Sequence, residues 1–293
     1  MKRIARGPLI AVLLMSAACQ PAPKVEFAVS DKPDYSGAYK FTLAKTAIKL
    51  DYGKSADGKA EDRRKITATA VPMEDESRVF TMSGRYEDLF SITTVSVTTA
   101  GDTRMFKTVG SDVQSKVEDL IKNVGGIVAV VAPLVFVSGG DLPKGELPDV
   151  IEVSSHLTTT QPGEVKFSGR LVNGISYELT VSPVAKDAIV TDEYLASREF
   201  KGRSAVLFYS ACRSASLALA NFPSAGRTTY YNFKVADPKF VQTIALPTKG
   251  AVTFHDTCGV DVAQQRSDAP TGDKILSTLV AQVKAIIDAK NKK

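Results

Sequence analysis

The cluster with the most reactive side chains in the sequence is His255-Asp256-Thr257-Cys258-Gly259. A histidine beside a carboxylate can act as an oriented base, and a nearby thiol can act as the nucleophile of a cysteine hydrolase. His255 and Asp256 are therefore the candidate catalytic residues. Neighbouring residues of a strand point to opposite faces of a sheet, however. The pattern therefore favours a polar strand end that turns at Gly259, with Cys258 in a disulfide.

The other polar side chains give weaker indications of catalysis. His156 alternates with apolar neighbours in a strand pattern, and two histidines far apart in the chain are a poor basis for a zinc site. The sequence has no Walker, GxGxxG, HExxH, GxSxG or paired CxxC motif. We therefore predict no cofactor and no metal. A periplasmic hydrolase is an alternative, and it requires His255 to meet an acidic residue such as Asp192 or Glu193 in one pocket.

An aromatic group, Phe208-Tyr209 together with the run from Tyr230 to Phe233, has two interpretations. Tyrosine supplies rigid amphipathic area, which suits a ligand groove or a partner surface. Aromatic residues at strand spacing also suit cross-strand packing. We favour the packing interpretation.

The N-terminal residues 1–18 have the three parts of a secretory signal, namely a basic start, an apolar run from Pro8 to Met15 and a small-residue end. We predict that this segment is removed. The run from Leu14 to Cys19 (LMSAAC) resembles the lipobox of bacterial lipoproteins, in which the cysteine thiol is acylated and the cysteine becomes the new N-terminus. Lipoboxes usually carry Leu at the place of Ser16, and the general signal peptidase would cut at the same bond. The resemblance implies lipid attachment, as palmitate, at Cys19.

Residues 19–34 are expected to form a tether, because Pro21 and Pro23 favour an extended chain. Gln20, rather than Asp, follows Cys19, which resembles the outer-membrane sorting pattern of enteric lipoproteins. The expected location is the cell envelope, at the outer membrane facing the periplasm or the cell surface. The lipid would be the contact with the membrane.

Two further cysteines, Cys212 and Cys258, remain if Cys19 carries lipid. An even remainder in an oxidising compartment predicts one disulfide, and two separate buried thiols are the alternative.

The charge of the chain excludes one class of partner. The formal net charge of +5 includes three basic residues of the signal and no acidic one, so the mature chain carries about +2. A balance this small is not the electrostatic footprint of a nucleic-acid-binding protein. We expect no nucleic-acid partner.

Alternation of apolar and polar residues predicts antiparallel strands through most of the chain. We predict a mainly β (α+β) fold of two β-rich lobes, each ending in an amphipathic helix. The lobes are residues 35–138 and 149–293, and the Gly- and Pro-rich stretch 139–148 is the linker. The helices are expected at 111–132 and 272–290 from their three-to-four apolar spacing. Similar endings of the two halves suggest an internal duplication.

Residues 123–140 (NVGGIVAVVAPLVFVSGG) form an uncharged stretch of eighteen residues, which reaches the length of a membrane span. Four glycines and Pro133 favour a buried helix end followed by a short strand. Insertion into a membrane is the alternative.

These features predict a membrane-tethered envelope lipoprotein that acts as a binding, structural or assembly module. Its expected partner is a protein or a surface polymer of the envelope. The alternatives are the periplasmic hydrolase and a membrane-inserting protein that uses residues 123–140.

Overall fold

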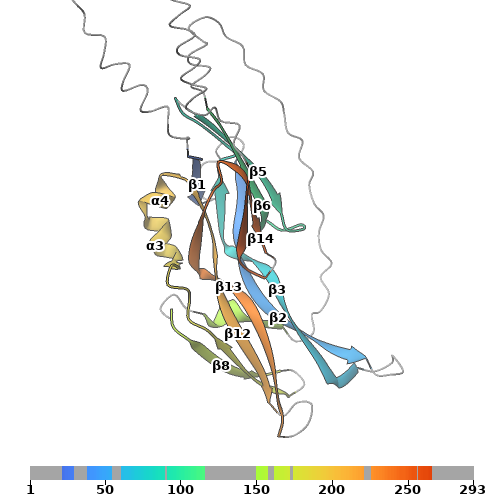
Figure 1. Ribbon diagram of the computed structural model, residues 1–293. Helices are drawn as coiled ribbons and strands as arrows, with labels where there is room; N and C mark the ends of the chain where they lie inside the picture. Colours follow the sequence, from blue (N-terminus) through green and yellow to red (C-terminus); the bar gives the residue numbers. More distant parts are fainter. Residues whose placement is uncertain are drawn as a thin grey trace, which may run out of the picture.

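The computed structural model describes residues 22–29, 38–54, 61–89, 91–115, 150–157, 162–171, 174–220, 226–255 and 257–265. Within these ranges the chain forms antiparallel sheets with a few short helices at one side (Figure 1). The prediction of a mainly β fold is confirmed.

The first sheet has the strand order β11-β1-β3-β2-β7. Its strands are β1 (Val25–Val29), β2 (Tyr39–Lys54), β3 (Glu61–Met82), β7 (Val150–Glu152) and β11 (Arg203–Ser204). The hairpin of β2 and β3 is paired from Tyr39 opposite Met82 to Lys54 opposite Glu61. This long hairpin runs obliquely through the body in Figure 1.

The second sheet has the order β10-β13-β12-β9-β8. Its strands are β8 (Val165–Arg170), β9 (Ser176–Val181), β10 (Ile189–Val190), β12 (Val206–Ala220) and β13 (Thr228–Ala245). A register shift between Ser210 and Ala211 interrupts the pairing of β12 with β13. Such bulges bend a strand and change the direction of its side chains.

The third sheet has the order β15-β14-β6-β5-β4. Its strands are β4 (Arg85–Glu87), β5 (Ser91–Thr99), β6 (Phe106–Ser115), β14 (Lys249–Phe254) and β15 (Val260–Gln264). The described helical segments are the 3-10 turn η2 (Val153–His156), α3 (Thr191–Ala196) and α4 (Arg198–Lys201).

Strands from both predicted lobes share sheets. β7 pairs with β2, and β14 pairs with β6, so the first and third sheets each combine residues from before and after the expected linker. The division into two lobes, and the internal duplication that it suggested, are not confirmed. The linker 139–148 lies outside the described residues.

The start of the helix expected at 111–132 is wrong, because Ser111 to Ser115 form the end of strand β6. This stretch pairs with β5, and Val113 is buried while Asp112 and Gln114 are not. The period of two fits a strand with one buried face. The remainder of that helix and the helix expected at 272–290 lie outside the described residues.

The tether expected at 19–34 is also wrong in part, because Val25–Val29 form strand β1. Val25 and Phe27 are buried, and the strand pairs with β3 and β11. The alternating apolar residues of this stretch therefore place it in a sheet, although prolines precede it and had predicted a free tether. Residues 123–140 lie outside the described residues, and among the described helices none is long and apolar enough to cross a bilayer.

An aromatic core fills one end of the body. Phe208 of β12 lies at its centre, with ring centroids 5.0 Å from Phe27, 5.4 Å from Phe41 and 5.3 Å from Phe80. Phe200 of α4 closes the cluster from the side. The rings meet mainly in edge and tilted geometries, which add to the stabilisation from burying their area.

An aliphatic core fills the other end, between the far halves of the same long strands. It joins residues of β2 and β3 to residues of β9, β12 and β13. The Tyr231 hydroxyl donates a hydrogen bond to the Ile66 carbonyl at 2.8 Å and so links the facing sheets. Buried members of this core include Ile48, Leu50, Ile66, Ile151, Val153, Leu179, Val181, Leu217, Leu219 and Val235.

Between the two cores lies a buried ion pair. The Arg213 guanidinium and the Asp237 carboxylate are 3.0 Å apart, and both side chains are fully buried. Arg213 also donates to the carbonyls of Ser182 and Gly163, at 2.6 Å each. Desolvation raises the pKa of Asp237, while the hydrogen bond from Arg213 acts in the opposite direction. The guanidinium therefore has partners on three segments of the chain.

Replacing Arg213 by Met is predicted to lower the free energy of unfolding by about 3 to 5 kcal/mol, because Asp237 is left as an uncompensated buried charge. Urea denaturation followed by circular dichroism measures the change. The double variant Arg213→Met/Asp237→Leu should recover much of the loss. A double variant no more stable than the single one would contradict this account.

Tyr194 of α3 is buried in the aromatic core, and its hydroxyl has no hydrogen-bond partner among the described residues. Burial raises the pKa of this phenol. Tyr194→Phe removes an unpaired polar atom and keeps the ring, so we predict an unchanged free energy of unfolding or an increase of up to about 1 kcal/mol. A loss above 1 kcal/mol in the same denaturation experiment would show that the hydroxyl has a partner.

Candidate functional site

A crevice of about 70 Å³ opens between β2, β12, the β5–β6 turn and the β14–β15 turn. Its lining is mostly apolar, and we call it the disulfide crevice because Cys258 forms part of its wall. The main apolar side chains in the lining are Phe41, Leu43, Met105, Phe106, Phe208 and Phe254.

The aromatic walls follow from strand alternation and sheet pairing. Phe41 of β2 stacks on Phe106 of β6 with ring centroids 4.3 Å apart. Phe254 of β14 lies 5.9 Å from Phe106 and 6.1 Å from Tyr209 of β12. Burial, together with the nearby charge of Asp187, raises the pKa of the Tyr209 phenol, which stays neutral at physiological pH. The crevice is thus an extension of the aromatic core toward solvent.

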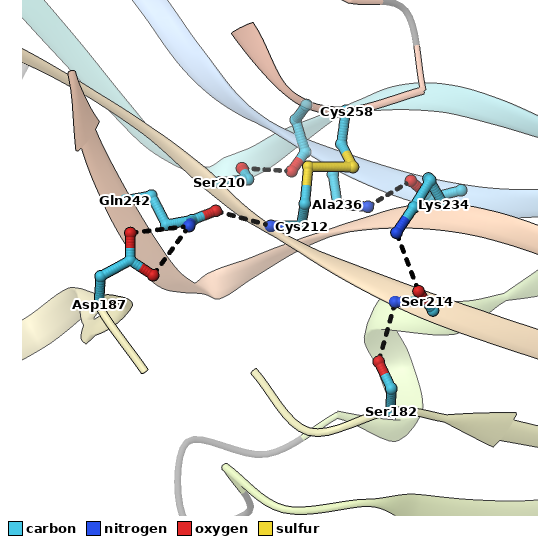
Figure 2. Close-up of a disulfide and its surroundings, with 11 residues drawn as sticks. Ser182, Asp187, Ser210, Cys212, Ser214, Lys234, Ala236, Gln242 and Cys258 are labelled. Atoms are coloured by element: carbon cyan, nitrogen blue, oxygen red, sulfur yellow. Dashed lines mark hydrogen bonds between the residues drawn. A yellow bond between two sulfur atoms is a disulfide. The ribbon is translucent and has the colours of Figure 1, made fainter. Parts of the chain in front are cut away.

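The disulfide between Cys212 and Cys258 fixes one wall of the crevice. The two Cα atoms lie 5.7 Å apart, and the bond joins β12 to the turn between β14 and β15. Figure 2 shows Gln242 beside it, with its side-chain carbonyl accepting from the Cys212 amide and its amide donating to Asp187. The predicted disulfide is confirmed.

His255 lies at the rim of the crevice, next to the same turn. Its Nε2 is 3.0 Å from an oxygen of Asp261 on β15, and both side chains are substantially exposed. The His255 amide also donates to the Gly259 carbonyl at 3.0 Å. The predicted strand end that turns at Gly259 is therefore present, while Asp256 lies outside the described residues.

Asp261 is the carboxylate partner of His255 that the sequence reasoning missed. The pairing of Thr253 with Asp261 across the β14–β15 hairpin brings this carboxylate to the histidine. The sequence could have indicated this pair: counting residues outward from the Gly259 turn along both strands of a hairpin places Asp261 opposite Thr253, close to His255. An exposed pair of this kind contributes little to stability.

Thr42 and Lys107 are polar lining side chains that make no hydrogen bond or ion pair with the described residues. Thr42 of β2 is 3% exposed, and its Oγ1 makes no hydrogen bond there. Lys107 of β6 is exposed and has no described carboxylate in contact with it. A buried hydroxyl without a partner is energetically costly. The crevice therefore combines an apolar interior with a hydroxyl, that of Thr42, and a cation, that of Lys107, which have no polar partner in the part of the chain that the structure describes.

Asp192 and Glu193, the acidic residues of the hydrolase alternative, are not in the lining of the crevice. Asp192 of α3 instead pairs with Arg78 of β3 at 2.6 Å.

His156 stacks on Phe167 with ring centroids 4.2 Å apart, so its observed role is packing. Among the described residues no group of histidine, cysteine and acidic side chains could hold a metal ion.

The aromatic residues singled out in the sequence divide between the two interpretations. Phe208 and Tyr209 line the crevice, and Phe208 is also packed in the aromatic core. Tyr231 and Phe233 pack against the aliphatic core, and Tyr230 is 67% exposed. Cross-strand packing and pocket lining both occur.

The chain has no match among protein-family models, curated proteins or solved structures.

Replacing Cys212 and Cys258 together by Ser is predicted to lower the free energy of unfolding by about 2 to 4 kcal/mol. The bond spans 46 residues of sequence, and opening so long a loop raises the entropy of the unfolded chain. Urea denaturation of the oxidised protein and of the double variant measures the difference. The parent protein treated with a dithiol reductant serves as the control and should match the variant; equal stability of the oxidised and reduced forms would contradict the prediction.

Proposed function

We propose that this chain is a lipid-anchored protein of a bacterial cell envelope, and that its β-rich body is a binding module that uses the disulfide crevice. The anchor is the acyl group on Cys19, and the module acts at the outer membrane, facing the periplasm or the cell surface. Residues 1–18 and the lipobox-like run that ends at Cys19 support the anchor.

The observation that carries the binding role is the composition of the crevice. Binding sites for small ligands are concave and mostly apolar, with a few polar groups that fix orientation. The disulfide crevice has this composition, since aromatic rings line it and Thr42 and Lys107 add polar groups that have no partner among the described residues. The Cys212–Cys258 bond also fits the oxidising compartment outside the inner membrane.

Binding is favoured over hydrolysis by the contacts of the polar residues. His255 pairs with Asp261 at the exposed rim, while Asp192 pairs with Arg78. A hydrolase needs a nucleophile, a base and an orienting group that converge on one reacting atom. Cys258 is the only cysteine in the described part of the crevice wall, and its sulfur is in a disulfide, so that wall has no free thiol to act as a nucleophile.

Replacing Cys19 by Ser is predicted to move the protein from the membrane fraction to the soluble periplasmic fraction, because a single serine carries no acyl chain. Fractionation after expression in a Gram-negative host measures the shift, and metabolic labelling with a palmitate analogue should mark only the parent protein. A variant that stays membrane-bound would place the anchor elsewhere in the chain.

The binding role is tested on the Cys19→Ser protein, purified from the periplasm without detergent. Solvent extraction followed by mass spectrometry should release a bound small molecule. Ala44→Trp, which fills the crevice from β2, should reduce its amount at least tenfold. Ala218→Trp makes the same change on β12 away from the crevice lining and should keep the molecule. Equal amounts from both variants, or none from any protein, would refute the binding role.

A further inference from the structure

We infer that the occupant of the disulfide crevice is an amphiphile with one acyl chain and an anionic head group, a refinement that rests on the proposed binding role. The chain enters among the aromatic rings, and the head group stays at the rim beside Lys107. The shared chemistry is a carboxylate or a phosphate on a single chain.

The size of the crevice limits the apolar part of the ligand. Sites for drug-sized molecules hold about 300 to 1,000 Å³, whereas this crevice holds about 70 Å³. That space accepts the end of one chain and excludes two chains side by side. A diacyl phospholipid therefore does not fit.

The backbone around the crevice favours an acyl chain over a peptide. The amide of Thr42 donates to the Arg104 carbonyl, that of Cys212 to the Gln242 side chain, and that of His255 to the Gly259 carbonyl. An extended peptide gains its affinity largely from main-chain hydrogen bonds. These three amides are therefore not free to donate to the carbonyl groups of a peptide, and backbone polar groups without partners are costly to bury. An acyl chain brings no such groups.

The charge at the rim favours an anionic head group. Lys107 lines the crevice, is exposed, and has no carboxylate in contact with it in the part of the chain that the structure describes. Of the acidic side chains near the crevice, Asp261 already pairs with His255 and Asp187 accepts hydrogen bonds from Gln242. A carboxylate or phosphate beside Lys107 would form an ion pair that this lysine does not make with any described residue. Because the site is exposed, salt should weaken the pair.

Thr42 gives the ligand a second polar contact. Its hydroxyl lines the crevice and is a donor without a partner among the described residues. An acceptor oxygen on the ligand would satisfy it. Thr42→Val keeps the shape of the side chain and removes the hydroxyl, so it separates this contact from packing.

The test uses the full mature chain carrying Cys19→Ser and measures displacement of a fluorescent fatty acid. The competitors are dodecanoate, dodecyl phosphate and dodecanol, each below its critical micelle concentration. We expect both anions to bind about tenfold more tightly than dodecanol, with a preference that falls as salt rises. Affinity should increase about fourfold per methylene along a series of shorter carboxylates, until the crevice is full.

The variants assign the effect to residues. Lys107→Gln should remove the preference for anions and leave dodecanol binding unchanged, while Thr42→Val should weaken every competitor that has an acceptor oxygen by about three- to tenfold without loss of stability. Ala44→Trp should abolish binding, and Ala218→Trp should leave it unchanged.

Three results would overturn the inference. These are equal affinity for dodecanol and dodecanoate, a preference for anions that survives Lys107→Gln, and stronger displacement by a short apolar peptide than by dodecanoate. Any of them leaves the binding role standing if extraction still releases a molecule that Ala44→Trp loses. The ligand class and the binding role therefore fail separately.

Discussion

The ion pair between Arg213 and Asp237 is the interaction on which the arrangement of both cores depends. β12 contributes Phe208 to the aromatic core and Leu217 to the aliphatic core, and Arg213 lies between them in the same strand. β13 likewise contributes Val241 to one core and Val235 to the other, with Asp237 between. A long strand that contributes side chains to two cores needs one position held in place where its side chains stop packing in the first core and begin packing in the second. A buried charge pair with several hydrogen bonds provides it, because few other arrangements satisfy all of its groups.

The polar junction also includes β2. Thr46 is fully buried between Leu43 of the aromatic core and Ile48 of the aliphatic core, and its hydroxyl accepts a hydrogen bond from the Ala236 amide at 2.8 Å. Figure 2 shows the Ala236 amide close to the disulfide. The junction therefore ties the first sheet to the second at the level where β12 bulges. Since Cys212 and Arg213 are neighbours in that strand, one side chain faces the crevice and the other faces the buried pair.

The sequence predicts the class of the fold because strand alternation is a local signal. The number of cysteines likewise predicts the bond between Cys212 and Cys258. The turn at Gly259 is predicted by the polar residues that precede this glycine, and Gly259 has the positive φ of a turn residue. The division into lobes fails because the pairing of β14 with β6 joins segments far apart in the chain, and no local pattern records such a contact. The helix expected from Ser111 fails for a related reason. Pairing with β5 decides the conformation of residues 111–115, whose apolar spacing also fits a helix.

The candidate site shows the same limit. His255 and Cys258 could be singled out by type, and Phe208 and Tyr209 as an aromatic pair, but the crevice that collects them needs three sheets. Thr42 and Lys107 carry no signal of their own, since isolated threonines and lysines are common in strands of any function. Asp261 becomes the partner of His255 only through the register of one hairpin. Arg213 is less predictable still, because a strand with no other charged residue gives no reason to expect a buried guanidinium.

An open apolar crevice beside a core is costly, and the disulfide explains how the fold keeps it. At roughly 24 cal/mol per Å³ of cavity, an empty space of about 70 Å³ costs at most about 2 kcal/mol. The cross-link of Cys212 to Cys258 contributes about 2 to 4 kcal/mol through the unfolded chain, which offsets that cost. The bond also holds the β14–β15 turn, so the wall carrying His255 and Gly259 does not collapse onto Phe106. Rigidity at this wall makes the crevice a preformed space, and a ligand that enters it does not have to reorganise the aromatic core.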